Sequence, residues 1–464
     1  MKYARPGFVT PDTLVVLFDE AEMEIDDGPK PDIEDSGSKP KKARKKKRKA
    51  IPDHLPRTIK LHDLNDNEKI CPEDNSKLTS IGYDIKEELH YTPASFEVIE
   101  HRFPKYACKV CQEGVRRVST LPSLLPKSYA SPSLLANIAT SKYCNHLPLY
   151  RLEQNFSQDG VHITRQVMAD WMIKLGNAVS PLIELMREEI FKSDVVSADE
   201  TPVRLLTKEG ERTSTQCYMW QLSRWGPRPY VIFEYDPSRS KSVSERLLGE
   251  FEGYIQVDGY AGYNSLFDSV GIRKRVGCLA HCFRKFKDFL KVLPKKDQGD
   301  HPSRKIIYMI RQLYTIEESL KTLAPEARYE QRKTAGCEKI VDDLEAFIAS
   351  EISEVAQSSP YYKALQYSLK ELPRVRVYLE HGGIEIDNNM CENAIRPFAL
   401  GRRNWLFICS EKEAQASANI YSLLITAKAN GIKPYDYLKK VIDRMPYCKT
   451  TEERKTLLPP AFSN

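Results

Sequence analysis

The chain has 464 residues, 41% hydrophobic and 29% charged, which is usual for a soluble protein large enough for several domains. It lacks an apolar run long enough to cross a bilayer, and its first residues do not resemble a secretion signal, so membrane and exported classes are disfavoured and a cytoplasmic protein is expected. The net charge is only +6, and the 11 cysteines are scattered, which favours reduced thiols over a disulfide framework.

Residues 1–50 are predicted to be a disordered arm. An acidic stretch, residues 19–35, precedes the basic tract KPKKARKKKRKA at 39–50, and such blocks repel themselves and have nothing to bury. The basic tract would neutralise DNA phosphates without reading base sequence. A solubilising tail, or an acid–base pair that shields itself, is the alternative. The side chains expected to contact DNA are Lys45, Lys46, Lys47, Arg48 and Lys49.

Residues 51–120 are predicted to form a small zinc-finger-like module that binds DNA. Cys71 opens it, two segments of alternating pattern follow, and Cys108 and Cys111 make a CxxC turn. Where a second CxxC cysteine would stand the residue is Asp74, whose carboxylate zinc also accepts. Alternatively the module folds on its small core without a metal. Other candidates for the fourth ligand are His62, His90 and His101.

Residues 121–190 are predicted to be a helical DNA-binding or linker region. In the segment HITRQVMADWMIKL a turn precedes a helix with Val167, Trp171 and Leu175 at four-residue spacing. This pattern is compatible with a helix-turn-helix that reads DNA. A plain helical bundle is the commoner explanation of the same spacing.

Residues 191–290 change to the period of strands. The predicted strands lie in SDVVSADETPVRLL, TSTQCYMWQLSRW, PRPYVIFEYD, GYIQVDGYAGYNSL and RVGCLAHCFRKFKDFL, the later ones leading into helices. Asp199 follows the first strand, and Asp258 ends the fourth and enters a Gly-rich turn. Carboxylates at strand ends of an open α/β sheet can share a metal. The alternative for each aspartate is an ordinary turn or cap residue.

Basic residues follow the last strand, in CLAHCFRKF. His281 and Arg284 are candidates for contact with substrate phosphate, although a core or capping histidine is an equally good interpretation of His281. Residues 291–383 are predicted to be a long, charged, helical insertion. It would hold flanking DNA or a partner chain, or serve as a passive spacer.

Residues 384–408 contain the acidic side chain around which the chain is organised. Glu392 is expected on a short helix, capped by Asn388 and Asn389 and limited by Pro397. We expect Asp199 and Asp258 to fold back and meet it. The spacing Asn389-x-x-Glu392 also fits a capping box, in which the glutamate would only satisfy a backbone N–H.

A basic cluster follows Glu392. A carboxylate beside arginines and an aromatic ring suits a site for phosphate and a divalent metal, and the tryptophan is a candidate for stacking on a splayed base. Its alternative is an ordinary core residue. Two closing helices complete the segment to residue 445, and residues 446–464 are expected to be a loose tail. The cluster consists of Arg396, Arg402, Arg403 and Trp405.

These motifs together resemble the insertion-sequence-66 type of DDE transposases. The matching stretches include LFDEAE, the basic tract, ICPED, PKYACKVC, SADETPVRLL, VDGYAGYNSL, CLAHCFRKF and above all NNMCENAIRPFALGRRNWLF. The resemblance covers residues from about 15 to about 445 and implies an α/β, ribonuclease-H-like catalytic domain with a helical insertion. The catalytic core would comprise residues 191–290 and 384–445.

The resemblance also implies the chemistry. The acidic trio would be Asp199, Asp258 and Glu392, holding Mg²⁺ or Mn²⁺ for two-metal cleavage of DNA and joining of the 3′-OH to a target. Partners would be terminal inverted repeats, target DNA, further copies of the chain, and small accessory proteins, near the nucleoid.

Two departures from the family pattern concern zinc and oligomerisation. Asp74 stands where the family has a zinc-binding cysteine, and only 16 residues precede LFDEAE, where the family usually has a leucine-rich coiled coil. Two rival functions remain open. One is a metal nuclease of the same fold, and the other is a catalytically silent DNA-binding protein derived from a decayed transposase.

Overall fold

A computed structural model describes residues 57, 59, 73, 95–107, 115–117, 121–208, 211–267 and 273–462. The chain divides into two units, one formed by residues 33–102 and the other by residues 1–32 and 103–464. The larger unit is a mixed α/β structure. The basic arm and the four predicted zinc ligands lie outside the described residues.

The larger unit begins with a short antiparallel pair, strands β1 (Lys105–Ala107) and β2 (Val115–Arg117). Four helices follow, as the pattern of residues 121–190 predicts. The Thr164 hydroxyl caps α4, whose residues Met168, Trp171 and Leu175 are buried in the main core. This burial agrees with the helical-bundle interpretation of the segment. The helices are α2 (Pro132–Tyr143), α3 (Leu149–Gln158), α4 (Arg165–Ala178) and α5 (Ser180–Phe191).

A five-stranded mixed sheet, in the order β5-β4-β3-β6-β7, forms the centre of this unit. β3, β4 and β5 form an antiparallel meander, whereas β6 and β7 run parallel to β3. All five segments that alternate in the sequence contain a strand. The strands are β3 (Val195–Lys208), β4 (Glu211–Arg224), β5 (Tyr230–Asp236), β6 (Gly253–Gln256) and β7 (Arg273–Val276), with α6 (Lys241–Leu248) between β5 and β6 and the 3₁₀ turn η2 (Ala261–Phe267) after β6.

The outer strand β5 is covered by the long helix α13 (Glu411–Ala429), which is buried on all sides over most of its length. An edge strand exposes unpaired backbone groups, and here side-chain hydroxyls satisfy them. Ser422 Oγ accepts from Phe233 N at 2.8 Å, and Thr426 Oγ1 accepts from Val231 N at 2.9 Å. The hydroxyls of Ser422 and Thr426, buried in α13, therefore have a structural explanation.

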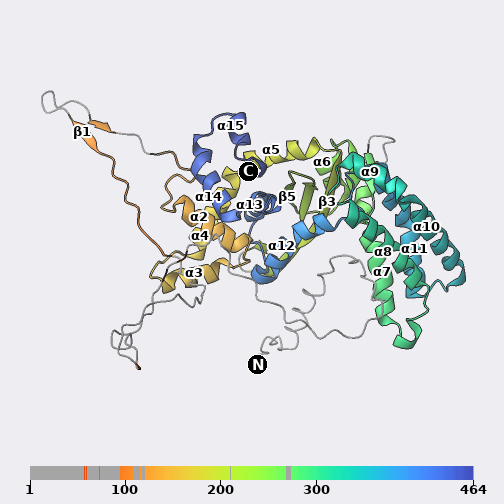
Figure 1. The fold of residues 1–464 in the computed structure, drawn as a ribbon. Coiled ribbons are helices and arrows are strands. Elements are labelled where there is room, and N and C mark those ends of the chain that lie inside the picture. The colour runs from red at the N-terminus through yellow and green to blue at the C-terminus, as the bar shows by residue number, and fades with distance from the viewer. Residues whose placement is uncertain are drawn as a thin grey trace, which may run out of the picture. The chain divides into compact units, whose positions relative to one another are not determined.

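The predicted insertion is helical and has a core of its own, built with α7 (Leu279–Val292). Figure 1 shows α7, α8, α10 and α11 together on one side of the sheet, with α2, α4 and α13 on the other. Its elements are the 3₁₀ turn η3 (Lys295–Asp297), the helices α8 (Ser303–Leu320), α9 (Pro325–Thr334), α10 (Cys337–Glu354) and α11 (Pro360–Val375), and the 3₁₀ turn η4 (Arg376–Glu380).

Two expectations for the C-terminal part are wrong. Helix α12 (Asn389–Trp405) continues through Pro397, although proline lacks the N–H that would bond one turn back. Residues 446–464 are not a loose tail as far as residue 462, because Leu457 and Leu458 enter the main core and Tyr437 Oη donates to Leu457 O at 2.9 Å. The closing elements are α14 (Pro434–Arg444), η5 (Met445–Tyr447), α15 (Thr451–Lys455) and η6 (Pro459–Phe462).

Among the described residues, none of the helices combines the length and apolar character that a membrane span requires.

Candidate active site

The parallel pairing of β3 with β6 brings Asp199 and Asp258 together. Val195 pairs with Tyr254 and Ser197 with Gln256, so the same register continued by two residues pairs Asp199 with Asp258. Neighbouring strands lie about 4.8 Å apart, and laterally paired residues point to the same face. The two carboxylates therefore lie side by side where β6 gives way to the Gly-rich turn.

The prediction that Asp199 follows a strand is wrong, because β3 continues to Lys208 and Asp199 is its fifth residue. The loop before α12 contacts β6 and β3 and carries Glu392 towards the two aspartates. Gln256 Nε2 donates to Glu385 O at 2.8 Å. Asn388 is buried, and its Nδ2 donates to Ala198 O at 3.3 Å, beside Asp199. Because Asn388 precedes the first residue of α12, Glu392 lies one turn further, above the carboxyl end of β6.

The charge of Asp199 interacts with the charges of Asp258 and Glu392, but within the described part of the chain the three do not form a set with ligand atoms all within 4.8 Å of one another. Burial, and then the nearby charges of Glu200, Asp258 and Glu392, hold the pKa of Asp199 well above its ordinary range. Like charges that crowd a partly buried site disfavour ionisation, and a bound cation relieves this cost. The donor set, three carboxylates, is the set that Mg²⁺ and Mn²⁺ prefer.

Both aspartates also make the local hydrogen bonds that a turn or cap residue would make. Asp199 Oδ1 accepts from Glu200 N at 2.9 Å, and Asp258 Oδ1 accepts from Tyr260 N at 3.0 Å. These bonds orient the carboxylates and leave each with a second oxygen. The turn interpretation and the metal-site interpretation are therefore compatible.

The predicted capping by Asn388 and Asn389 is wrong, because Asn388 is the N-cap residue of α12 but the helix start has no side-chain capping hydrogen bond. Glu392 does not form the predicted capping box either. Its Oε2 accepts from Arg284 Nη2 at 2.7 Å, and its Oε1 lies 3.7 Å from His281 Nδ1. Asp387 Oδ1 instead accepts from Asn389 N at 3.0 Å, just before the helix. Burial is the main reason why the pKa of His281 is lowered, so this imidazole is neutral at pH 7.

The basic side chains predicted to bind DNA differ in their surroundings. Arg396, one turn after Glu392, is half-buried and has no ion-pair partner among the described residues. Arg402 Nη1 donates to Thr201 Oγ1 at 2.6 Å and so fastens α12 to β3. Arg403 is exposed on the last turn of α12. Trp405 packs edge-on against Phe398, with ring centres 5.6 Å apart, as a core residue does.

Gln221 and Cys278 lie at the site but are not among the residues that the sequence predicts for it. Gln221 is opposite Asp199 on β4, fully buried, and neither polar atom of its amide has a hydrogen-bond partner among the described residues. The signal was a glutamine in an otherwise apolar stretch, next to the strand that carries an aspartate. Cys278 precedes α7 and accepts from Asn388 N at 3.3 Å.

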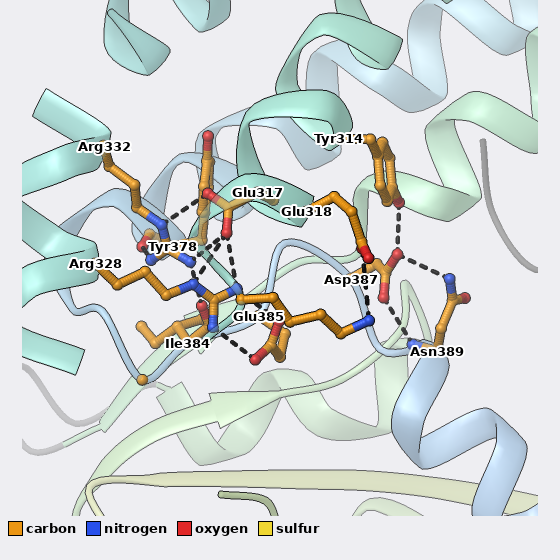
Figure 2. A network of polar contacts seen from close by, with 12 residues as sticks. Tyr314, Glu317, Glu318, Arg328, Arg332, Tyr378, Ile384, Glu385, Asp387 and Asn389 are labelled. Atoms are coloured by element: carbon orange, nitrogen blue, oxygen red, sulfur yellow. Dashed lines mark hydrogen bonds and ion pairs between the residues drawn. The ribbon is translucent and has the colours of Figure 1, made fainter. Parts of the chain in front are cut away.

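The helical insertion is connected to the loop before Glu392 by a buried network of charges (Figure 2). Glu317 on α8 is 5% exposed and bonds Arg328 Nη2 at 2.7 Å and Arg332 Nε at 2.8 Å. Arg328 Nη1 also donates to Glu385 Oε1 at 2.7 Å. The insertion therefore supports the loop from which α12 starts, which a passive spacer would not do.

A second contact from the insertion reaches Asp387, the residue before the N-cap of α12. Tyr314 Oη donates to Asp387 Oδ2 at 2.6 Å, and the same oxygen accepts from Asn389 Nδ2 at 2.8 Å (Figure 2). Burial raises the pKa of Asp387, and the hydrogen bond from Tyr314 opposes this. Tyr314 thus joins α8 to the first residue of the helix that carries Glu392.

Replacing Asp199 by Asn is expected to stabilise the metal-free protein at neutral pH. The raised pKa of Asp199 in the folded chain means that folding favours the protonated form. Its contribution to stability is complete below the ordinary pKa of aspartate and is lost as pH rises through the folded value. We expect D199N to raise the melting temperature by about 2–6 °C at pH 7 and to have no effect at low pH.

Thermal unfolding of wild type and D199N, from low pH to pH 7, measures this difference in melting temperature. D194N is the matched control, since the Asp194 side chain is 81% exposed just before the same strand. If D199N and D194N change the melting temperature equally, or if the change in D199N does not depend on pH, the pKa of Asp199 is not raised in the folded chain.

The sequence matches three family models. Residues 127–416 match the model described as "Transposase IS66 family", residues 68–112 match the "zinc-finger binding domain of transposase IS66", and residues 422–459 match the "IS66 C-terminal element". The chain is 33% identical to "Uncharacterized protein y4qI" of Sinorhizobium fredii (strain NBRC 101917 / NGR234) over 91% of this chain and 79% of that protein. It is 29% identical to "Uncharacterized protein y4jD" of the same strain, over 88% and 81%.

Proposed function

The chain belongs to the IS66 transposase family, and from this premise we propose that it is a DDE transposase with Asp199, Asp258 and Glu392 as its catalytic residues. It would cut at the ends of its insertion element and join the resulting 3′-OH to target DNA. One observation carries this proposal: Asp199 on β3 lies near enough to Asp258, after β6, and to Glu392, on the first turn of α12, for their charges to raise its pKa.

The catalytic domain is proposed to be ribonuclease-H-like, divided into residues 191–290 and 384–445 by the insertion. Three antiparallel strands followed by two parallel ones support this fold. Residues 51–120 would be the zinc-binding, DNA-binding module and residues 121–190 a helical DNA-binding or linker region. The family matches at 68–112 and 127–416 agree with a division between module and catalytic part.

Mg²⁺ or Mn²⁺ would be held by Asp199, Asp258 and Glu392. When bound, such ions activate the attacking hydroxyl and stabilise the leaving oxygen of a phosphodiester. The protein itself holds the three carboxylates in place. Arg284 fixes Glu392 by its ion pair at 2.7 Å, and Asn388 fixes the start of α12 against β3.

The cations beside this site suit a polyanionic substrate. Arg396 is the better candidate for a DNA phosphate, because it has no ion-pair partner among the described residues and lies one turn after Glu392. Arg403 is exposed on the last turn of α12, two turns beyond Arg396. Arg402 and Trp405 are proposed to hold α12 in place. Arg402 already donates a hydrogen bond to Thr201, and Trp405 already packs against Phe398.

Zinc and further partners belong to the same proposal. The match to a zinc-finger binding domain supports a zinc ion held by Cys71, Cys108, Cys111 and Asp74, since zinc accepts a carboxylate as fourth ligand. The element ends and the target are the proposed DNA partners. Further copies of the chain, and small proteins from the same element, are proposed to assemble there.

DNA binding by the basic tract predicts a strong dependence on salt. Each neutralised phosphate contributes about 0.9 to the slope of log K against log salt concentration. Replacing the five basic residues 45–49 by glutamine is expected to reduce the magnitude of this slope by about 4, measured by fluorescence anisotropy on end DNA. A control with the same loss of charge replaces exposed lysines scattered elsewhere. They are Lys339, Lys363, Lys412, Lys439 and Lys449.

If both five-fold variants change the slope equally, net charge and not the basic tract determines DNA binding. If neither changes it, the tract does not contact DNA and the solubilising tail is the better interpretation.

A plasmid assay with the element's terminal inverted repeats tests the proposed reaction. Full-length protein, with accessory proteins of the element and Mg²⁺, is expected to give joined products in which element ends are linked to new target sites. Cleavage without joining would identify a metal nuclease of the same fold. Binding of the ends without cleavage would identify a silent DNA-binding protein.

A further inference from the structure

A second set of potential metal ligands lies at the start of α7. It combines three donor types from two places in the chain: the Cys278 thiol and the His281 imidazole at the start of α7, and the Glu392 carboxylate on α12. One ligand atom from each lies within 4.8 Å of the others. Cys278 and His281 have the C-x-x-H spacing that places both on one side of a helix start.

Two of these atoms are buried without a hydrogen-bond partner. His281 Nδ1 and Glu392 Oε1 are shielded from solvent, and neither forms a hydrogen bond within the described part of the chain. They lie 3.7 Å apart, which is too far for a hydrogen bond between them. Buried polar atoms almost always have a hydrogen-bond partner. Two neighbouring buried atoms without one therefore indicate that a ligand binds between them.

The surrounding contacts hold all three side chains. Arg284 Nη2 binds Glu392 Oε2 at 2.7 Å, which leaves Oε1 available. Asn388 N donates to Cys278 Sγ at 3.3 Å, as backbone amides do to metal-bound thiolates. The contacts of Cys278 and Glu392 therefore orient these two ligands before an ion binds.

We propose that Cys278, His281 and Glu392 bind one borderline-soft divalent cation of the Zn²⁺ or Co²⁺ type, at a site separate from the Asp199 and Asp258 carboxylates. Zinc bonds of about 2.0–2.3 Å in tetrahedral geometry place ligand atoms about 3.3–3.7 Å apart. The present separations need side-chain shifts of about 1 Å or less to meet this. Sulfur and imidazole ligands disfavour Mg²⁺, so the site discriminates by ligand chemistry.

Three protein ligands leave a fourth position open for water or a phosphate oxygen. Glu392 would be a ligand either of this ion or of Mg²⁺, but not of both at once. This competition rests on the proposed function. Zinc bound here would hold Glu392 beside His281 and away from Asp199 and Asp258. The binding itself does not depend on DNA cleavage and is tested without DNA.

Cobalt binding to the full-length protein tests the proposal, because a cobalt–thiolate bond gives an intense near-ultraviolet charge-transfer band. Wild type and C278S are dialysed against Co²⁺ in excess Mg²⁺, and bound cobalt and absorbance are measured per chain. C278S is expected to bind one cobalt fewer and to lose part of the band. H281Q and E392Q are expected to lower the affinity for this one cobalt ion by about 100-fold or more. The cobalt bound by the proposed zinc module should remain.

C409S is the control, because Cys409 is exposed and belongs to neither set, and it should behave as wild type. Thermal unfolding without metal shows whether C278S keeps its fold. If it does not, H281Q and E392Q decide the question, since both side chains are partly exposed. Equal cobalt uptake and identical spectra in wild type, H281Q and E392Q would overturn the proposal, whatever the outcome of the transposition assay.

Discussion

Replacing Asp258 by Asn is expected to lower the rate of DNA-end cleavage by about 10²–10⁴-fold, with little change in DNA affinity. The substitution keeps the shape of the side chain and removes a charge that we propose holds the metal beside Asp199. Removing one preorganised electrostatic contact at a reacting centre costs about 10²–10³-fold, and losing a metal ligand costs at least as much. Single-turnover cleavage of labelled end DNA measures the rate, and anisotropy measures binding.

D194N is again the matched control. It makes the same chemical change at an exposed position five residues before Asp199, so it should cleave at the wild-type rate. Folding of D258N is checked by its melting temperature. Cleavage by D258N at a wild-type rate, with accessory proteins present, would remove Asp258 from the catalytic residues.

Replacing Glu317 by Gln is expected to destabilise the protein by about 3–5 kcal/mol. Glu317 is 5% exposed, and its carboxylate binds two arginines that are 7% and 1% exposed. Removing one partner of a buried ion network leaves buried charge uncompensated, which costs about this much. Urea unfolding followed by circular dichroism gives the free energy of unfolding.

E330Q provides the matched comparison. Glu330 and Lys333 form an ion pair at 3.0 Å, but their side chains are 66% and 50% exposed, so the same substitution should cost about 1 kcal/mol or less. Similar losses for E317Q and E330Q would show that the network in Figure 2 contributes no more than a surface pair.

Destabilisation of the insertion should also reach the candidate site. Arg328 binds both Glu317 and Glu385, and Glu385 lies three residues before Asn388, the N-cap residue of α12. A loosened insertion would therefore free the loop that positions Glu392. This connection explains why a long insertion separates the second aspartate from the glutamate and yet belongs to the same structure.

The strands could be predicted because their period is a local property. Alternation located β3 to β6, although β3 continues past Asp199 to Lys208 and β7 begins two residues before the predicted segment. The Gly-rich turn after Asp258 lies just beyond the end of β6. The position of Asp199 relative to Asp258 follows once β3 and β6 are parallel neighbours. Pairing is a long-range property, so the sequence alone indicated only that both aspartates lie near strand ends.

The errors have a common cause, since tertiary contacts overrode local signals. Pro397 was expected to end α12, but the helix continues and Phe398 is buried in the core. The capping box predicted for Asn389 and Glu392 does not form, because Arg284 binds the carboxylate from α7. Leu457 showed no period in a short segment, yet its burial secures the C-terminal residues.

The composition of the cation-rich segment after Glu392 does not show which of its arginines is available to bind phosphate. Arg396 and Arg402 are equivalent in the sequence as candidates for phosphate. In the structure Arg402 is bonded to Thr201, whereas Arg396 has no ion-pair partner among the residues described. Which of several arginines is available depends on what packs against the helix.

We propose that Asp199, Asp258 and Glu392 together hold divalent ions at DNA. Calorimetric titration of Mg²⁺ into the full-length protein bound to terminal-repeat DNA measures this binding, with wild type compared to E392Q. We expect saturable uptake by wild type and a loss of at least one ion, or about 100-fold weaker binding, in E392Q. Equal magnesium uptake by the two proteins would show that Glu392 does not hold a divalent ion.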